Sequence, residues 1–272
     1  MGQGTVYTVA SGKGGVGKTT FSVNLSAAVG LADVDVVVID ADFGMANLAD
    51  HLGIAAETPT VHDILAGRSD IDAAIRSVRD SLHALPGAVD LGDFATIDPD
   101  GLVEVVDHAS RRFDVVVIDC GAGLSYETAL PLGVADEVVL VTTPTSSSVQ
   151  DTRKTAALAE RMQTPVAGLV VNRTTPKTRM DPASVADRLD ADLLGTIPDS
   201  AAVEDSLVAG TPLVWRDPHD PAAGAIRSIA TSLTGVTIPD PMPTDLTTDG
   251  ADEPADADEA VSRGLLARLL GR

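Results

Sequence analysis

A ten-residue stretch near the amino terminus constrains the fold of this chain more than any other feature. Residues 11–20 read Ser-Gly-Lys-Gly-Gly-Val-Gly-Lys-Thr-Thr, between the apolar run Thr5–Ala10 and a helical pattern over Lys18–Leu31. A glycine-rich loop between a strand and a helix is typical of a phosphate-binding loop, because backbone N–H groups can approach phosphate oxygens where no Cβ intervenes. The positive end of the following helix points at the same oxygens. The sequence therefore predicts a nucleotide-binding strand–loop–helix unit.

The residues of this loop have separate expected roles. Lys18 would neutralise the β- and γ-phosphates of a nucleoside triphosphate, and the hydroxyl of Thr19 would coordinate Mg²⁺. The loop residues expected to bind the nucleotide are Gly12, Lys13, Gly14, Gly15, Val16, Gly17, Lys18, Thr19 and Thr20.

The rest of the chain alternates short apolar runs with helical patterns. Continuous β-branched runs indicate strands that are buried on both faces of a sheet, and such strands are parallel and joined by crossover helices. Strands are expected at Thr5–Ala10, Val34–Ile39, Leu82–Leu85, Phe113–Ile118, Glu137–Val141, Pro165–Val171 and Leu193–Ile197. Helices are expected at Lys18–Leu31, Pro99–Arg112, Ser148–Arg161, Pro182–Leu189 and Pro221–Leu233. The predicted fold is a doubly wound, mostly parallel α/β domain over residues 1–236, with helices on both faces.

Charge and composition exclude several classes of function. The formal net charge is −21, with 40 Asp+Glu against 19 Lys+Arg, and such a field repels nucleic acid, so no nucleic-acid partner is expected. The acid excess is typical of adaptation to a saline cytoplasm, where salt screens the repulsion. One cysteine and five scattered histidines argue against an internal disulfide or a zinc site. We expect a cytoplasmic protein without a signal peptide or a membrane span.

Three aspartates stand at the ends of apolar runs, where ligands bind in parallel α/β sheets. Asp40 and Asp42 follow the run Val36–Ile39 and would share one side of an extended chain. One of them can face Mg²⁺ through a water molecule while the other orients an attacking water. Asp119 ends the run Val115–Ile118 and is expected to hold Mg²⁺ through water.

The segment Lys13–Thr20 resembles the signature of the deviant Walker A ATPases, the MinD/ParA family. The resemblance implies an ATP-dependent homodimer in which Lys13 reaches the partner's ATP as a cation supplied in trans. By the same comparison Asp42 positions the attacking water and Asp40 lies on the metal side. The expected catalytic residues are therefore Lys13, Lys18 and Asp42, and the expected metal-binding residues are Thr19, Asp40 and Asp119.

The loop after Asp119 also resembles this family, with one departure. Gly123 resembles the glycine that senses the γ-phosphate. The preceding Cys-Gly-Ala stands where the family more often has Thr or Ser followed by Pro-Pro or Pro-Ala. The subfamily therefore stays open, because such a loop is also similar to the flagellar-number regulators related to MinD.

Two later loops resemble the parts of the family that bind the base. Asn172, beside Arg173, resembles the asparagine that reads adenine with its donor and acceptor groups. Pro198 and Asp199 resemble the loop that closes over the base with its backbone groups. All four residues are expected to contact the nucleotide.

The composition changes after residue 236. Residues 237–260 hold eight acidic residues and no Lys or Arg, which predicts a flexible acidic linker. Residues 261–272 have the pattern of an amphipathic helix and resemble the membrane-targeting tail of MinD. Packing on the domain or binding in a protein groove are alternatives. The residues expected to face a membrane are Val261, Arg263, Leu265, Leu266, Arg268, Leu269 and Leu270.

These features together predict a MinD-like, Mg²⁺-dependent ATPase. Binding of ATP would dimerise it and place it peripherally on the inner face of the cell membrane, and hydrolysis, stimulated by an activating protein, would release it. Its output would be the positioning of division or polar machinery. The alternatives are a positioning ATPase for motility organelles, similar to the flagellar-number regulators, and a ParA-like DNA-partitioning ATPase.

Overall fold

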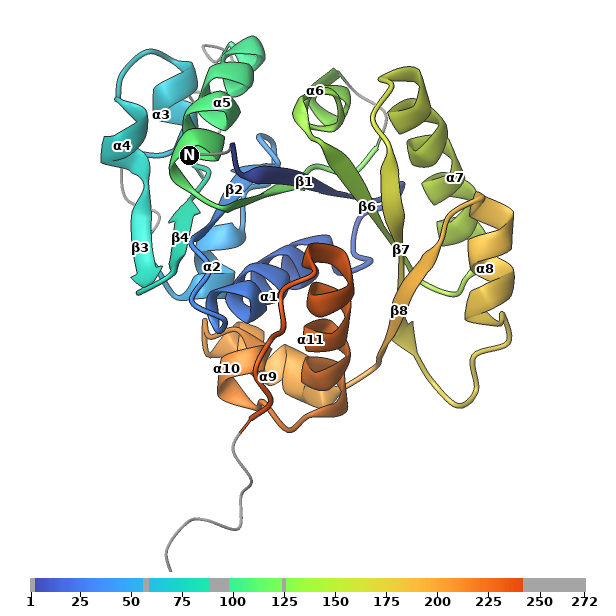
Figure 1. Ribbon diagram of the computed structural model, residues 1–272. Helices are drawn as coiled ribbons and strands as arrows, with labels where there is room; N and C mark the ends of the chain where they lie inside the picture. Colours follow the sequence, from blue (N-terminus) through green and yellow to red (C-terminus); the bar gives the residue numbers. More distant parts are fainter. Residues whose placement is uncertain (1–2, 56–58, 89–97, 124–125, 242–272) are drawn as a thin grey trace, which may run out of the picture. The chain divides into compact units, whose positions relative to one another are not determined.

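A twisted, eight-stranded sheet forms the centre of the part of the chain that the structure describes (Figure 1). The computed structural model describes residues 3–55, 59–88, 98–123 and 126–241. The strands are β1 Thr5–Ala10, β2 Val36–Ala41, β3 Arg76–Arg79, β4 Leu82–Leu85, β5 Val115–Cys120, β6 Glu137–Thr142, β7 Val166–Thr174 and β8 Leu193–Pro198. Their order is β3-β4-β2-β5-β1-β6-β7-β8, and only β3 pairs antiparallel, at one edge. The predicted mostly parallel α/β fold is confirmed.

Helices cover both faces of the sheet, as expected for strands that are apolar throughout. The helices are α1 Lys18–Gly30, α2 Leu48–Leu52, α3 Val61–Leu65, α4 Ile71–Ala74, α5 Leu102–Arg112, α6 Tyr126–Val134, α7 Ser146–Arg161, α8 Pro182–Leu189, α9 Ala201–Val208, α10 Leu213–Arg216 and α11 Pro221–Thr234, with a 3₁₀ turn at Pro99–Gly101. Side chains of α1, α10 and α11 pack on one face. Side chains of α3 and α5, and of α7 and α8, pack on the other.

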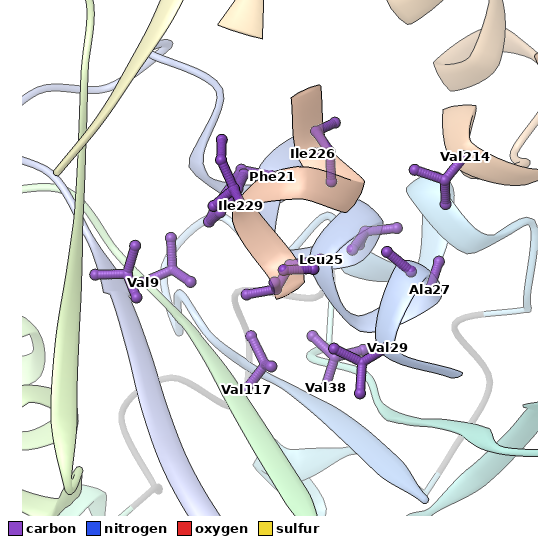
Figure 2. Packing of buried hydrophobic residues seen from close by; sticks show 14 of the residues in the cluster. Val9, Phe21, Leu25, Ala27, Val29, Val38, Val117, Val214, Ile226 and Ile229 are labelled. Atoms are coloured by element: carbon purple, nitrogen blue, oxygen red, sulfur yellow. The ribbon is translucent and has the colours of Figure 1, made fainter. Parts of the chain in front are cut away.

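The core beneath α1 and α11 fixes the helix that follows the glycine-rich loop (Figure 2). Phe21 and Leu25 of α1 are buried against Ile226 and Ile229 of α11 and against strand residues that include Val117. Burying each of these side chains contributes about 1.5–3 kcal/mol. The amino end of α1 is therefore held firmly at the carboxyl edge of the sheet.

Strands β2 and β5 run two residues further than their apolar runs predict. Their pairing continues through Asp40 opposite Asp119 and ends at Ala41 opposite Cys120. Both strands also begin two residues later than expected, at Val36 and Val115. The two aspartates thus lie inside adjacent strands, and Asp119 also pairs with Val9 of β1, the strand that leads into the glycine-rich loop.

The expected acidic linker and terminal helix fall mostly outside the described residues. Chain contacts divide the protein into a unit of Met1–Pro239 and a second unit of Asp240–Arg272. In the first unit, Ile238 is still buried against the core. The seven membrane-facing residues predicted within residues 261–272 all lie outside the described residues. In the part of the chain that is described, no helix is long and apolar enough to cross a membrane.

Candidate nucleotide site

The glycine-rich loop adopts a conformation that its glycines make possible. Gly15 and Gly17 have φ angles of +75° and +95°, a region that residues with a Cβ rarely adopt. A Cβ on Gly12 would lie 2.0 Å from the backbone carbon of Asp151 in α7, so this glycine lets the loop approach that helix. A Cβ on Gly14 or Gly15 would meet nothing within 4 Å, which leaves this side of the loop open to a ligand.

The two lysines of the loop occupy opposite environments. The side chain of Lys18, at the start of α1, is buried, with 8% exposed, and it lies near the Asp119 carboxyl. Lys13 is exposed and forms no salt bridge with any described residue. Lys18 therefore faces the inside of the site, whereas Lys13 presents its charge to solvent.

Asp119 has one carboxylate oxygen with a partner and one without. Its Oδ1 accepts a hydrogen bond of 2.8 Å from the Ser22 hydroxyl of α1. Its Oδ2 is buried and has no hydrogen-bond partner among the described residues. Burial raises the pKa of the Asp119 carboxyl from 3.8 to about 6, although the Thr19 hydroxyl and the Lys18 ammonium lower it. A buried, unpartnered carboxylate oxygen beside a threonine hydroxyl is a donor set that suits hydrated Mg²⁺.

Asp40 uses both carboxylate oxygens to hold the loop that follows it. Oδ1 accepts from the backbone N–H of Asp42, and Oδ2 accepts from the N–H groups of Asn47 and Leu48 at the start of α2. Burial and the neighbouring Asp119 carboxylate raise the pKa of Asp40 to about 7, although the backbone hydrogen bonds lower it. Its geometry is that of a loop anchor, and its predicted place on the metal side stays a prediction.

Asp42 lies between two loops at the edge of the site. Its side chain is partly exposed, and Oδ1 accepts a hydrogen bond of 3.2 Å from the Met45 N–H. A Cβ on Gly121 would come within 3.3 Å of the same oxygen, so the loop after β5 passes close beneath this carboxylate. Asp42 is thus partly exposed at the point where the loops after β2 and β5 meet.

The loop after β5 contains the predicted sensor glycine. Gly123 has a φ of +116°, and a Cβ there would meet nothing within 4 Å. Cys120 is fully buried, its thiol donates to the Val9 carbonyl, and burial raises its pKa to about 12. This cysteine is therefore a packed strand residue without thiolate character.

A cavity of about 340 Å³ opens beside the glycine-rich loop. Its lining contains the four residues predicted to contact the base together with others from α1 and the loop after β8. Among them are Gly17, Thr20, Phe21, Asn24, Asn172, Arg173, Pro198, Asp199 and Ser200. The cavity therefore brings together residues that lie far apart in the sequence, next to the glycine-rich loop.

The Asn172 amide contacts the glycine-rich loop directly. Its Nδ2 donates a hydrogen bond of 2.8 Å to the Val16 carbonyl, and its Oδ1 accepts from the Arg173 N–H. One amide hydrogen remains for a ligand. Arg173 is held at a φ of +57°, a strained conformation that places its exposed side chain on the cavity wall. Asn172 thus braces the loop, whether or not it also reads a base.

The loop after β8 is fixed against β7. The Asp199 N–H donates to the Thr174 carbonyl at 2.9 Å. This backbone donor is therefore already engaged, and the base would meet other groups of Pro198 and Asp199. The predicted closing loop forms part of the cavity wall.

Sequence reasoning missed Asn24 in α1. Its Oδ1 accepts from the Val214 N–H, and its Nδ2 donates to the Thr20 carbonyl. The next residue of α10, Trp215, donates its Nε1 to the Ala27 carbonyl at 3.3 Å. The signal that could have pointed to Asn24 was an amide side chain between the apolar residues Val23 and Leu25 of the helix.

The chain matches a known family over most of its length. The CobQ/CobB/MinD/ParA nucleotide-binding domain matches residues 7–213. The fold and the phosphate-binding loop define a P-loop nucleotide-binding protein. The chain belongs to the MinD/ParA family of P-loop ATPases.

Individual relatives agree with this assignment. The chain is 36% identical over 228 residues to an ATP-binding protein of Methanocaldococcus jannaschii, covering 84% of this chain and 86% of that one. It is 34% identical over 244 residues to the septum site-determining protein MinD of Synechocystis, covering 86% and 91%. The structure resembles that of Pyrococcus horikoshii MinD complexed with Mg-ADP, with a TM-score of 0.81 and 32% identity over 85% of this chain and 96% of that one.

Proposed function

We propose that this chain is a Mg²⁺-dependent ATPase of the MinD type. In this proposal ATP binding produces a homodimer that associates peripherally with the inner face of the cell membrane through residues 261–272. Hydrolysis, stimulated by an activating protein, releases it. The activity would position division or polar machinery, as the name of the Synechocystis relative suggests. The net charge of −21 disfavours the alternative of a DNA-partitioning protein.

The observation that carries the proposal is the different exposure of two lysines of the glycine-rich loop. Lys18 is buried beside Asp119, where its charge can act on phosphates bound in its own chain. Lys13 is exposed and without a salt-bridge partner among the described residues, so it is free to meet a charge from outside. An unpaired cation beside a triphosphate site suits the neutralisation of a second subunit's phosphates.

The donors around Asp119 suit a hydrated magnesium ion. The Thr19 hydroxyl and the unpartnered Asp119 Oδ2 would hold Mg²⁺, the latter through water. The ion would offset charge on the β- and γ-phosphates. Asp42, partly exposed at the meeting of two loops, would orient the attacking water and accept its proton.

Two lysine variants separate binding from dimerisation. Lys18→Ala should abolish ATP binding, whereas Lys13→Ala should bind ATP and stay monomeric. Asp42→Ala should bind ATP, dimerise and fail to turn over. Binding is measured with a fluorescent ATP analogue, and oligomeric state by sedimentation with Mg²⁺ and ATP. A monomeric Asp42→Ala protein saturated with Mg²⁺ and ATP would refute the dimer.

Deletion of residues 261–272 tests the membrane proposal. The truncated chain should bind and hydrolyse ATP, but it should not pellet with vesicles that contain anionic lipid. A matched control replaces Arg263 and Arg268 with Glu in the full chain, which keeps the apolar residues and reverses the charge. Truncated protein that still pellets with vesicles in the presence of ATP would contradict the assignment of the tail.

A further inference from the structure

His62 is a buried histidine that joins two loops beside Asp42. It lies in the short helix α3 and is 2% exposed. Its Nε2 is 2.9 Å from the Phe43 carbonyl oxygen, and its Nδ1 is 2.9 Å from the Ala88 backbone nitrogen. Phe43 directly follows Asp42, and Ala88 lies in the loop after β4. One imidazole therefore bridges the loop of the candidate catalytic aspartate to its neighbour.

The two contacts determine the tautomer of the ring. A backbone N–H can only donate, so Nδ1 must be the acceptor from Ala88. The proton then resides on Nε2, which donates to the Phe43 carbonyl. Both ring nitrogens therefore form hydrogen bonds, and the neutral His62 side chain links the backbones of Phe43 and Ala88. The Phe43 ring also packs edge-on against it, with 5.7 Å between the ring centroids.

The helix that carries His62 is itself anchored. Thr60 and Asp63 form a capping box at the start of α3, and Arg68 forms a salt bridge with Asp63. The Val61 N–H donates to the Pro86 carbonyl at 2.9 Å. His62 thus acts from a rigid support, as a group that positions another group must.

The opposite side of the Asp42 loop is held by Asp40. Asp40 accepts from the Asp42 N–H and from the first N–H groups of α2. In the described residues, the Phe43 carbonyl has His62 as its side-chain donor. Loss of that bond would free the peptide between Phe43 and Gly44, one residue beyond Asp42, while leaving the Asp40 contacts in place.

We propose that His62 is a positioning residue for hydrolysis: through its Nε2–H bond to the Phe43 carbonyl it holds Asp42 in the orientation that directs the attacking water. This inference rests on the proposed ATPase function. His62 does not touch the nucleotide, and it acts through the backbone of the loop. The cavity lined by Asn172 and Pro198 does not include His62 or Phe43. The bond therefore affects turnover and leaves nucleotide affinity unchanged.

Two isosteric variants separate the two hydrogen bonds. In His62→Gln the amide nitrogen reaches the place of Nε2, so the Phe43 bond is kept and the Ala88 bond is lost. In His62→Asn the amide oxygen occupies the place of Nδ1, so the Ala88 bond is kept and the Phe43 bond is lost. Each variant keeps one of the two hydrogen bonds. We therefore expect the two variants to have equal unfolding midpoints.

The first readout is steady-state ATP hydrolysis with Mg²⁺, alongside binding of a fluorescent ATP analogue. We expect His62→Asn to lose about tenfold in kcat, as loss of one oriented hydrogen bond implies, with analogue affinity within about twofold. His62→Gln should keep kcat within about twofold of the wild-type value. Equal kcat values in the two variants, or a parallel loss of affinity in His62→Asn, would overturn the proposal.

The second readout needs no catalysis. Hydrogen exchange of the peptide that spans residues 42–48 should be faster in His62→Asn than in His62→Gln and wild type. Exchange that is unaltered in His62→Asn would reject the positioning role even if the wild-type chain shows no turnover. Absence of wild-type turnover, together with faster exchange in His62→Asn, would refute the proposed ATPase function and leave the role of His62 in holding the loop intact.

Discussion

Replacing Asp119 with Asn should make the nucleotide-free protein more stable while destroying the proposed Mg²⁺ site. The wild-type carboxyl is buried, and its Oδ2 has no hydrogen-bond partner among the described residues. The amide that Asp119→Asn introduces can keep the Oδ1 contact with Ser22, and the substitution removes the buried charge beside Asp40. The site would thereby lose a group whose ionised form costs stability until a metal ion is bound.

The size of the gain follows from the pKa of Asp119, which burial raises from 3.8 to about 6. A carboxyl whose folded pKa is raised stabilises the fold fully only below its unfolded pKa, and this contribution is lost as the pH rises through the folded pKa. The difference corresponds to about 3 kcal/mol lost between pH 4 and pH 7. Asp119→Asn avoids that loss. Its free energy of unfolding should therefore exceed that of the wild type by about 3 kcal/mol at pH 8, and the difference should shrink toward pH 4.

The assay is urea unfolding of both proteins at several pH values, without and with Mg²⁺ and ATP. Ligand at 100 times its Kd should add about 2.7 kcal/mol to the wild type and much less to the variant. Asp42→Asn is the matched control, because it removes a partly exposed carboxylate and should change stability by less than about 0.5 kcal/mol. An Asp119→Asn protein that is less stable at pH 8, or whose advantage is independent of pH, would refute the reasoning.

Three further predictions concern other parts of the chain. Gly17→Ala should abolish ATP binding in filter assays, because its φ is +95° and the new Cβ would lie 2.4 Å from the Asn172 amide nitrogen. Cys120 should react with a thiol reagent at pH 8 only after unfolding, since burial raises its pKa to about 12; rapid labelling of the native protein would contradict this. The melting temperature, measured by calorimetry, should rise from millimolar to molar KCl, because salt screens the repulsion of a −21 net charge. A melting temperature that does not change with KCl concentration would contradict this.

Much of the fold was predictable because most of its strands contain an apolar run. The runs at Thr5–Ala10 and Leu82–Leu85 match β1 and β4 residue for residue. The four- and five-residue helices were missed because they are too short to show a period. Pro131 inside α6 hid that helix, since proline normally ends one. The edge strand β3, Arg76–Arg79, is short and half polar, so its pairing depends on β4 and not on its own sequence.

The site was predictable to the extent that its chemistry is local in the chain. The glycine-rich loop carries its own backbone geometry, so one motif sufficed to place it between β1 and α1. The contacts that brace it are distant in sequence: Asn172 lies 156 residues from Val16, and Ser22 lies 97 residues from Asp119. The folded loops likewise determine that three backbone N–H groups donate to Asp40. They also determine that His62 forms hydrogen bonds with two loops. No local residue pattern indicates such pairings, because the partners lie far apart in the sequence or are backbone groups.

The one tryptophan of the chain gives the molecule a built-in optical probe. The Trp215 indole is tied to α1 at Ala27, and the Arg79 guanidinium lies 4.3 Å from its ring centroid. The N–H of its neighbour Val214 donates a hydrogen bond to Asn24, which lines the candidate nucleotide cavity. The cavity residue Asn24 and the Trp215 indole are thus connected through α1 and through Val214. We therefore expect native tryptophan emission to report ligand titrations, without a dye attached to the chain.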